Sequence, residues 1–494
     1  MNPFLVRIIN GVPGSRKSLN QLDAIAARPR DVVWASARQQ LLDEHAAYCR
    51  EVSSRRDTSL AVKVIHSGQS VPGTVKRRVE TTLQAGSSNL PRVVMITHEA
   101  LMALDPADLA GWEVVIDEVP DGCIASGSVS AQASWIGLDQ RYSLEPVGIG
   151  GWHQVRPRGG VEPLQRSAIA QDAAKDLAAL HKCVLTPGRA VYVDLAAWQD
   201  AQVLGRKIAW WSVWTPLSLV GAAGVTVIGA GFFRSTAYLV ATALHRDAIR
   251  FDRIEPAHPI LRKPQTFRIH YFTRHRGSTT WWATEEGSRC LVQVSRYFEN
   301  NRFAGFFSCN ADMLPYFRYR FEAEFCTPKQ AGTNTLINHT SCAYIYSNKA
   351  QEADKSILEM FDLDASQILQ AREYEDIIQF ALRGAPRNPN YEGPYDVYLY
   401  SQDQAEMLMR YLKEHGIATE VELVPVLEAG IMEVQRPASD RSQEGTVDPL
   451  GHQERIDQRR RADALRQKRR RAVKVAQKKA EGTHRRAGRP RKAG

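Results

Sequence analysis

The sequence lacks paired cysteines, although it is 494 residues long. There is no Cys-x-x-Cys pair and no histidine at zinc-finger spacing, which argues against a structural zinc site and against a disulfide framework. We expect buried, reduced thiols in a cytosolic protein. The scattered cysteines are Cys49, Cys123, Cys183, Cys290, Cys309, Cys326 and Cys342.

Signals for secretion or membrane insertion are also scarce. Met1 to Asn10 lacks the charged segment, the long apolar run and the cleavage site of a secretory signal. An uncharged stretch, Ile208 to Phe233, is long enough to cross a bilayer but contains Pro216 and several glycines. We interpret its second half, Gly224 to Gly229, as a buried strand and expect no membrane partner. The Ala- and Arg-rich composition favours a bacterial, plasmid or phage setting, and hence the nucleoid or a phage-infected host cytoplasm.

Net positive charge is absent from most of the chain, although the total is +10. Residues 453–494 contain 17 Lys or Arg and 4 Asp or Glu, a net charge of +13, so the preceding 452 residues carry −3. This basic tail has too few large apolar residues to form a core. We therefore expect it to be disordered and to bind a polyanion.

Regular alternation is the main pattern of the first 120 residues. Short apolar runs, typical of buried strands, alternate with amphipathic stretches, typical of helices. This predicts a parallel sheet covered by helices on both faces. The expected strands are Phe4–Asn10, Val32–Ser36, Leu60–His66, Val93–Thr97 and Trp112–Ile116, and the expected helices include Lys17–Ala27 and Gln39–Val52.

The rest of the chain predicts an insertion, a second lobe and a tail. Residues from about 121 to 220 lose the alternation and predict an insertion, after which Val225–Ile228 resumes the sheet. Pro256, Pro259 and Pro264 indicate a hinge before a second β/α stretch. We therefore predict an α/β protein with two parallel-sheet lobes, residues 1–260 and 261–430, and a tail, residues 431–494. The second-lobe strands are expected at Phe267–Phe272, Phe303–Ser308, Ala343–Ser347, Val397–Ser401 and Ile417–Val424.

A glycine-containing loop between the first predicted strand and helix gives the strongest local signal. Glycines there let backbone amides close around a phosphate, and the helix N-terminus favours negative charge. Lys17 would contact the β- and γ-phosphates and Ser18 would coordinate magnesium, which predicts ATP and Mg²⁺ as ligands. An ordinary Gly/Pro/Ser turn is the alternative. The loop reads Gly11, Val12, Pro13, Gly14, Ser15, Arg16, Lys17, Ser18.

Arg16 departs from the phosphate-loop pattern, which has its last glycine at this position. A side chain there is expected to crowd the phosphates or to alter the loop. A second element is the apolar strand that ends at Asp117 and Glu118. Asp117 would hold magnesium and Glu118 would orient the attacking water.

Together these elements resemble the superfamily 2 (DExD/H-box-like) helicases and translocases, over roughly residues 4–425. The resemblance implies two RecA-like lobes that clamp ATP, with Thr97 and His98 touching the nucleic-acid backbone. Leu5–Asn20 resembles motif I, Val32–Leu41 motif Ia, Val94–Leu101 motif Ib and Asp117–Pro120 motif II.

Later motifs follow in the family's order but diverge. Val227–Phe232 has Gly-Ala-Gly where motif III has Ser-Ala-Thr. Lys329–Asn334 resembles motif V and places Gly332 and Thr333 at the nucleotide.

Gln379–Arg387 resembles motif VI. Gln379 and Arg383 are expected on one helical face, and Pro386 is expected to end that helix so that Arg387 projects. Arg383 and Arg387 are the arginine-finger candidates. A surface helix with two solvated arginines is the alternative.

The end of the tail, Arg485–Lys492, resembles an AT-hook. Arg486, Arg489 and Arg491 would then enter the narrow minor groove of A/T-rich DNA. The alternatives are a polybasic segment that binds any phosphate backbone, and a nuclear-localisation role for Lys468–Arg471.

The sequence as a whole predicts an ATP-dependent helicase or translocase that acts on nucleic acid. We expect DNA as its substrate and replication or repair proteins as further partners. Two other functions stay open. One is a viral DNA-packaging (terminase-like) ATPase with a nuclease lobe, and the other is a non-hydrolysing DNA-binding scaffold with a degraded phosphate loop.

Overall fold

The computed structural model describes most of the chain up to Arg436. Its elements belong to one compact unit, Met1–Val434. The basic tail, like Pro259 and Pro264 of the expected hinge, lies outside the described residues. These are 3–85, 90–130, 135–149, 151–162, 175–204, 207–256, 263, 265–328, 335–350 and 354–436.

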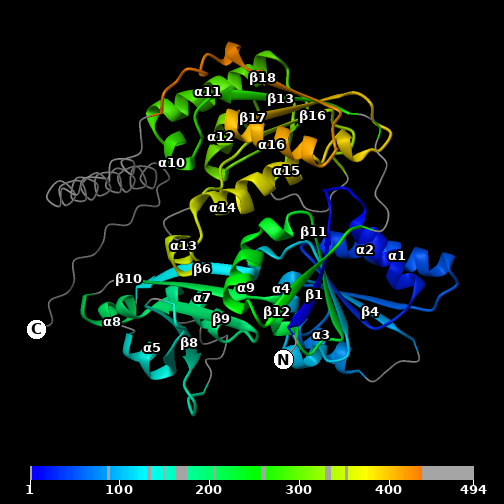
Figure 1. Ribbon diagram of the computed structural model, residues 1–494, viewed down its shortest axis with the longest axis vertical. Coiled ribbons are helices and arrows are strands. Elements are labelled where there is room, and N and C mark those ends of the chain that lie inside the picture. Colours follow the sequence, from blue (N-terminus) through cyan, green and yellow to red (C-terminus); the bar gives the residue numbers. More distant parts are fainter. Residues whose placement is uncertain are drawn as a thin grey trace, which may run out of the picture. The chain divides into compact units, whose positions relative to one another are not determined.

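The first lobe is built on a parallel sheet with the phosphate-loop strand near one end (Figure 1). All the strands expected in the first 120 residues are present, within a residue or so of the expected bounds. The sheet also contains β11, the strand expected at Val225–Ile228, and β12, which was not predicted. The spatial order of the whole sheet is β12 (Ile249–Ile254), β1 (Phe4–Asn10), β11 (Gly224–Gly229), β5 (Glu113–Asp117), β2 (Val32–Ser36), β4 (Arg92–Thr97) and β3 (Ala61–Ile65).

Helices cover both faces of this sheet because successive strand residues point to opposite sides. On β2, Val33 and Ala35 pack into the cluster that contains α3 and α4 residues, whereas Val32 and Trp34 pack against α1 and α2. Such strands carry unbroken apolar runs, as the sequence does. The helices of this lobe are α1 (Lys17–Ala27), α2 (Gln39–Arg55), α3 (Val75–Gln84), α4 (His98–Ala103) and α9 (Thr236–His245).

The insertion is an antiparallel sheet with its own helices. Sequence periodicity missed its strands because β10 (Lys207–Trp214) alternates only at its start and is then buried on both faces up to Trp214. A further strand of the insertion, β8, spans Trp152–Pro157. The other elements are β6 (Ile124–Ser130), α5 (Trp135–Arg141), β7 (Tyr142–Pro146), α7 (Lys175–Val184), β9 (Arg189–Asp194) and α8 (Leu195–Leu204).

The second lobe is another parallel sheet with helices on both faces. Leu399 packs with α15 and α16 residues on one face, and Tyr400 packs with α11 residues on the other. The strand order is β15 (Glu324–Phe325), β14 (Phe306–Cys309), β16 (Ser341–Ile345), β17 (Pro394–Ser401), β13 (Thr266–Thr273), β18 (Glu420–Pro425).

The helices of the second lobe include a five-residue π-helical turn, Gln370–Tyr374, directly before α15. The α-helices are α10 (Thr279–Trp282), α11 (Glu285–Asn300), α12 (Leu314–Phe317), α13 (Lys355–Phe361), α14 (Ala365–Leu369), α15 (Glu375–Ala381) and α16 (Gln402–Glu414).

The two sheets confirm the predicted fold class: α/β, with two RecA-like parallel-sheet lobes and an insertion in the first.

The uncharged stretch Ile208–Phe233 forms most of β10 and all of β11, so its second half is the buried strand expected from the sequence. Of the helices that the structure describes, none combines the length and the apolar character needed to span a bilayer.

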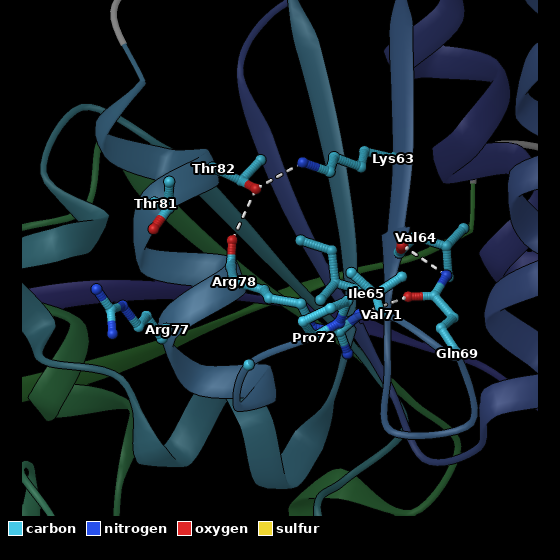
Figure 2. Close-up of a pocket in the computed structure, with 11 residues that line it drawn as sticks. Lys63, Val64, Ile65, Gln69, Val71, Pro72, Arg77, Arg78, Thr81 and Thr82 are labelled. Atoms are coloured by element: carbon cyan, nitrogen blue, oxygen red, sulfur yellow. Dashed lines mark hydrogen bonds between the residues drawn. The ribbon is translucent and has the colours of Figure 1, made fainter.

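A cavity of ≈ 670 Å³ lies at the β3 edge of the first sheet, away from the phosphate loop (Figure 2). Gln69 folds over this edge and donates a 2.9 Å hydrogen bond from Nε2 to the carbonyl oxygen of Val64. Arg78 holds the same loop by donating 2.7 Å to the carbonyl oxygen of His66. Side chains of the same molecule therefore cover part of the unpaired edge of β3.

Candidate functional site

The phosphate loop runs from the end of β1 to the first residue of α1. Gly14 and Arg16 both adopt the left-handed conformation, with φ of 74° and 60°, which turns the chain tightly into the helix. The N-terminus of α1 has no side-chain cap and no acidic residue in its first turn. Its amide groups and the positive end of the helix dipole are therefore suited to an anion.

Arg16 does not crowd the loop as expected from the sequence. Its Nη2 donates a 2.7 Å hydrogen bond to the Tyr48 hydroxyl and lies 3.9 Å from Oδ2 of Asp23. Both partners belong to the α1 and α2 helices, so the guanidinium is directed towards them. A side chain at this position instead costs conformational energy, because Arg16 adopts the left-handed backbone conformation that glycine adopts freely.

Lys17 is held against the loop it follows. Its Nζ donates to the carbonyl oxygens of Gly11 (2.9 Å) and Val12 (2.8 Å) and to Oγ of Ser15 (3.2 Å). Burial lowers the pKa of Lys17 to about 8, against the opposing charges of Asp117 and Glu118. The ammonium is therefore charged at neutral pH. A phosphate bound in the loop would replace the loop oxygens as its hydrogen-bond acceptor.

Ser18 and Asp117 meet at the carboxyl ends of β1 and β5. Oγ of Ser18 donates a 2.6 Å hydrogen bond to Oδ1 of Asp117. Ser36 lies level with Asp117 in the sheet, and its Oγ is 3.5 Å from Oδ2. Burial raises the pKa of Asp117 to about 6. A hydroxyl and a carboxylate side by side are hard oxygen donors of the kind that Mg²⁺ prefers.

Glu118 is fixed in a strained position next to Asp117. Its φ is 71°, and its backbone N–H donates 2.7 Å to the carbonyl oxygen of Ile228 on β11. Burial, and then the charge of Asp117, raise the pKa of Glu118 to about 7, against the opposing charges of Arg383 and Arg387. A carboxyl that titrates near neutrality is suited to accept a proton.

The second lobe contributes Gln379, Arg383 and Arg387. The helix that carries Gln379 ends at Ala381, so the expectations that it includes Arg383 and that Pro386 ends it are wrong. Gln379 and Arg383 nevertheless line the same cavity. Beyond the helix the chain passes close to β17: a Cβ at Gly384 would overlap the Tyr395 hydroxyl.

Arg383 is buried beside the acids of the first lobe, with 2% of its surface exposed. Among the described residues its Nη1 has no hydrogen-bond partner. Burial lowers the pKa of Arg383 to about 9, with Glu118 opposing the shift. Arg387 also acts on the pKa of Lys17 and of Glu118. Both arginines thus lie near enough to Glu118 to affect its pKa, and the alternative of a solvated surface arginine does not hold for Arg383.

A cavity of ≈ 490 Å³ opens between side chains of the two lobes. Glu118, Gln379 and Arg383 line it, together with three groups that the sequence did not single out: Arg38, Arg372 and Glu375. Arg38 lies within the stretch that resembles motif Ia, which was the available signal. Glu375 lies four residues before Gln379, on the same face of α15.

Thr97 and His98 have structural partners. Thr97 caps α4 by accepting a 3.3 Å hydrogen bond from the amide of Ala100. His98 is buried, with Nε2 2.9 Å from the carbonyl oxygen of Asp117. Their contact with nucleic acid stays a prediction. The other expected site residues, Gly332, Thr333, Arg486, Arg489 and Arg491, lie outside the described residues.

No protein-family model and no curated protein matches the chain. Among solved structures, it is similar to S. tokodaii Xpd4, at 12% identity over 85% of this chain and 96% of that chain, with a TM-score of 0.46. It is also similar to an XPD helicase (9%, 85% and 96%, TM-score 0.48) and to S. cerevisiae Dbp5 bound to RNA and ADP BeF3 (8%, 86% and 85%, TM-score 0.33). Sequence identities and TM-scores this low give no information about the activity of this chain.

Proposed function

We propose that this chain binds ATP with magnesium between its lobes, hydrolyses it, and uses the cycle to move along or separate strands of nucleic acid. The observation that carries the proposal is the 2.6 Å contact of Ser18 with Asp117, made near the partly buried ammonium of Lys17. Three features fit a magnesium-bound triphosphate: the uncapped N-terminus of α1, the paired oxygen donors, and the buried Nη1 of Arg383.

In this proposal Lys17 and the amides at the start of α1 hold the phosphates, and Ser18 and Asp117 hold the metal. Bound magnesium would neutralise part of the phosphate charge. Glu118 accepts the proton of a water whose oxygen bonds to the γ-phosphorus, while the bond to the β,γ-bridging oxygen breaks. Arg383 and Arg387 stabilise the charge that develops on the phosphoryl oxygens, and Gln379 lines the same cleft.

Two features support action on nucleic acid: the positive charge of the tail and the arrangement of the chain in two lobes. The tail, with a net charge of +13 over residues 453–494, would bind a phosphate backbone, and its AT-hook-like end favours DNA. Closing the cleft on ATP and reopening it after hydrolysis would move one lobe relative to the other.

An ATPase assay on the full-length protein, alone and with single-stranded DNA, double-stranded DNA or RNA, tests the proposal. We expect phosphate release that DNA stimulates and that Glu118→Gln abolishes. Glu113→Gln is the matched control, because Glu113 begins the same strand and pairs with Arg30 at 2.7 Å. Absence of turnover with every nucleic acid would remove the enzyme assignment. Metal-dependent cleavage of plasmid DNA by the same protein would favour the packaging ATPase instead.

A further inference from the structure

Glu375 connects the two lobes and has no part in the hydrolysis proposed above. It is the first residue of α15, and its Oε1 accepts a 2.9 Å hydrogen bond from Nε2 of Gln379. Its Oε2 lies 3.5 Å from Nη2 of Arg234, which follows β11 in the first lobe. One carboxylate thus faces a side chain from each lobe.

Gly231 provides the space for this carboxylate. A Cβ added at Gly231 would overlap the carboxylate of Glu375, so only glycine lets the acid lie against the backbone there. Gly231 is the last residue of the Gly-Ala-Gly segment that departs from motif III. The glycine that departs from motif III is therefore the residue against which Glu375 of the second lobe packs.

Arg234 contacts the second lobe in a further place. Its guanidinium lies over the ring of Tyr411, 5.4 Å from the centroid, and Tyr411 is a buried residue of α16. Arg234 is itself held firmly, because Phe232 is buried in the core and Ser235 caps α9. The turn that contains Arg234 in the first lobe therefore contacts both α15 and α16 of the second lobe.

We propose that Glu375 is a positioning residue that latches the second lobe to the first through Arg234, in the space left by Gly231, and so holds Gln379 at the nucleotide site. The role of Gln379 rests on the proposed function, whereas the contact between the lobes does not. The two parts can therefore be tested separately.

The latch is tested by the distance between the lobes in full-length protein without nucleotide. Donor and acceptor dyes are placed on Ser54→Cys of α2 and Glu414→Cys of α16, both exposed positions, in a Cys183→Ser background. Single-molecule energy transfer should give a narrow distribution in this parent. Glu375→Gln, which removes the charge, and Gly231→Ala, which fills the space, should each broaden it.

Glu406→Gln is the matched control, because Glu406 on α16 accepts a 2.8 Å hydrogen bond from Gln402 with the same four-residue spacing. It should leave the distribution unchanged. Identical distributions in the parent, Glu375→Gln and Gly231→Ala would overturn the latch.

Kinetics test the effect on the nucleotide site. Glu375→Gln should lower kcat roughly tenfold and change KM for ATP less than about twofold at neutral pH, as expected for loss of one coupled contact. Arg234→Lys, which keeps the charge, should retain more activity than Arg234→Gln.

The split between kcat and KM and the rescue by Arg234→Lys separate positioning from a merely structural role. If the wild type shows no turnover, the proposed function fails and the distance measurement alone decides the latch. If it turns over ATP and Glu375→Gln matches it in both distance and kcat, only the latch fails.

Discussion

The hydroxyl of Ser18 donates a 2.6 Å hydrogen bond to Oδ1 of Asp117 across 99 residues of sequence. The sheet makes this contact, because β1 and β5 both pair in parallel with β11 and end at the same edge. A parallel sheet gathers residues that follow its strands, whatever lies between them in the chain. Here the residues gathered are a phosphate loop and two carboxylates.

Loss of the Lys17 ammonium should strongly weaken nucleotide binding. Lys17→Ala should lower kcat/KM for ATP by about a hundredfold or more, because it removes a preorganised positive charge from the phosphate loop. Titration with a fluorescent ATP analogue measures the affinity, and Lys63→Ala on the edge strand β3 is the control. Unchanged affinity in Lys17→Ala would place the nucleotide elsewhere.

The pH profile of kcat/KM should be narrow. Glu118 must be ionised to accept a proton, and its pKa is raised to about 7, so activity should rise as pH increases through that value. Lys17 must be protonated, and its pKa is lowered to about 8, so activity should fall above that value. Since kcat/KM reports the free enzyme, we expect an optimum between the two. A profile flat from pH 6 to 9 would contradict the assigned roles.

Arg383→Ala should reduce turnover more than binding. The buried guanidinium faces charge that grows only during reaction, so kcat should fall about a hundredfold while the Kd for ATP changes little. Because Arg383 opposes the raised pKa of Glu118, the acidic limb of the residual activity should move to higher pH. Circular dichroism checks the fold. Equal losses in binding and turnover would instead indicate a ground-state contact.

Arg16→Gly tests whether the loop is degraded or merely strained. Glycine adopts the left-handed conformation freely, which should gain about 1 kcal/mol of stability, offset by up to about 1 kcal/mol for the exposed contacts with Tyr48 and Asp23. We expect ATP turnover within about twofold of the wild type, because the side chain points to the helices. Activity that appears only in Arg16→Gly would support the scaffold function.

Truncation after Arg436 should weaken DNA binding and flatten its dependence on salt. The tail's cations would release counterions from DNA, so their loss should reduce the slope of log Kd against log salt. Fluorescence anisotropy over a salt series measures both quantities. In the full chain, Arg489→Ala should remove any preference for A/T-rich DNA. An unchanged salt slope in the truncated protein would exclude the tail from binding.

The parts of the site next to strand ends could be predicted from the sequence, because strand periodicity and one short motif fix their place. The phosphate loop and the Asp117–Glu118 pair are of this kind. Glu375 could not be predicted, since its position depends on the space at Gly231 and on Arg234 in the other lobe. The end of α15 at Ala381 was not predicted either, because helical spacing continues through Arg383 in the sequence, and tertiary packing such as that of Gly384 against β17 cannot be derived from spacing.

Gln69 has a consequence for the protein's behaviour in solution. The outermost strand of a sheet presents backbone groups that can recruit a strand from another molecule. By bonding the Val64 carbonyl oxygen, Gln69 fills one position at which a foreign amide would dock. Gln69 thus shields part of the edge strand β3 from pairing with a strand of another molecule, at the far side of the sheet from the phosphate-loop strand β1.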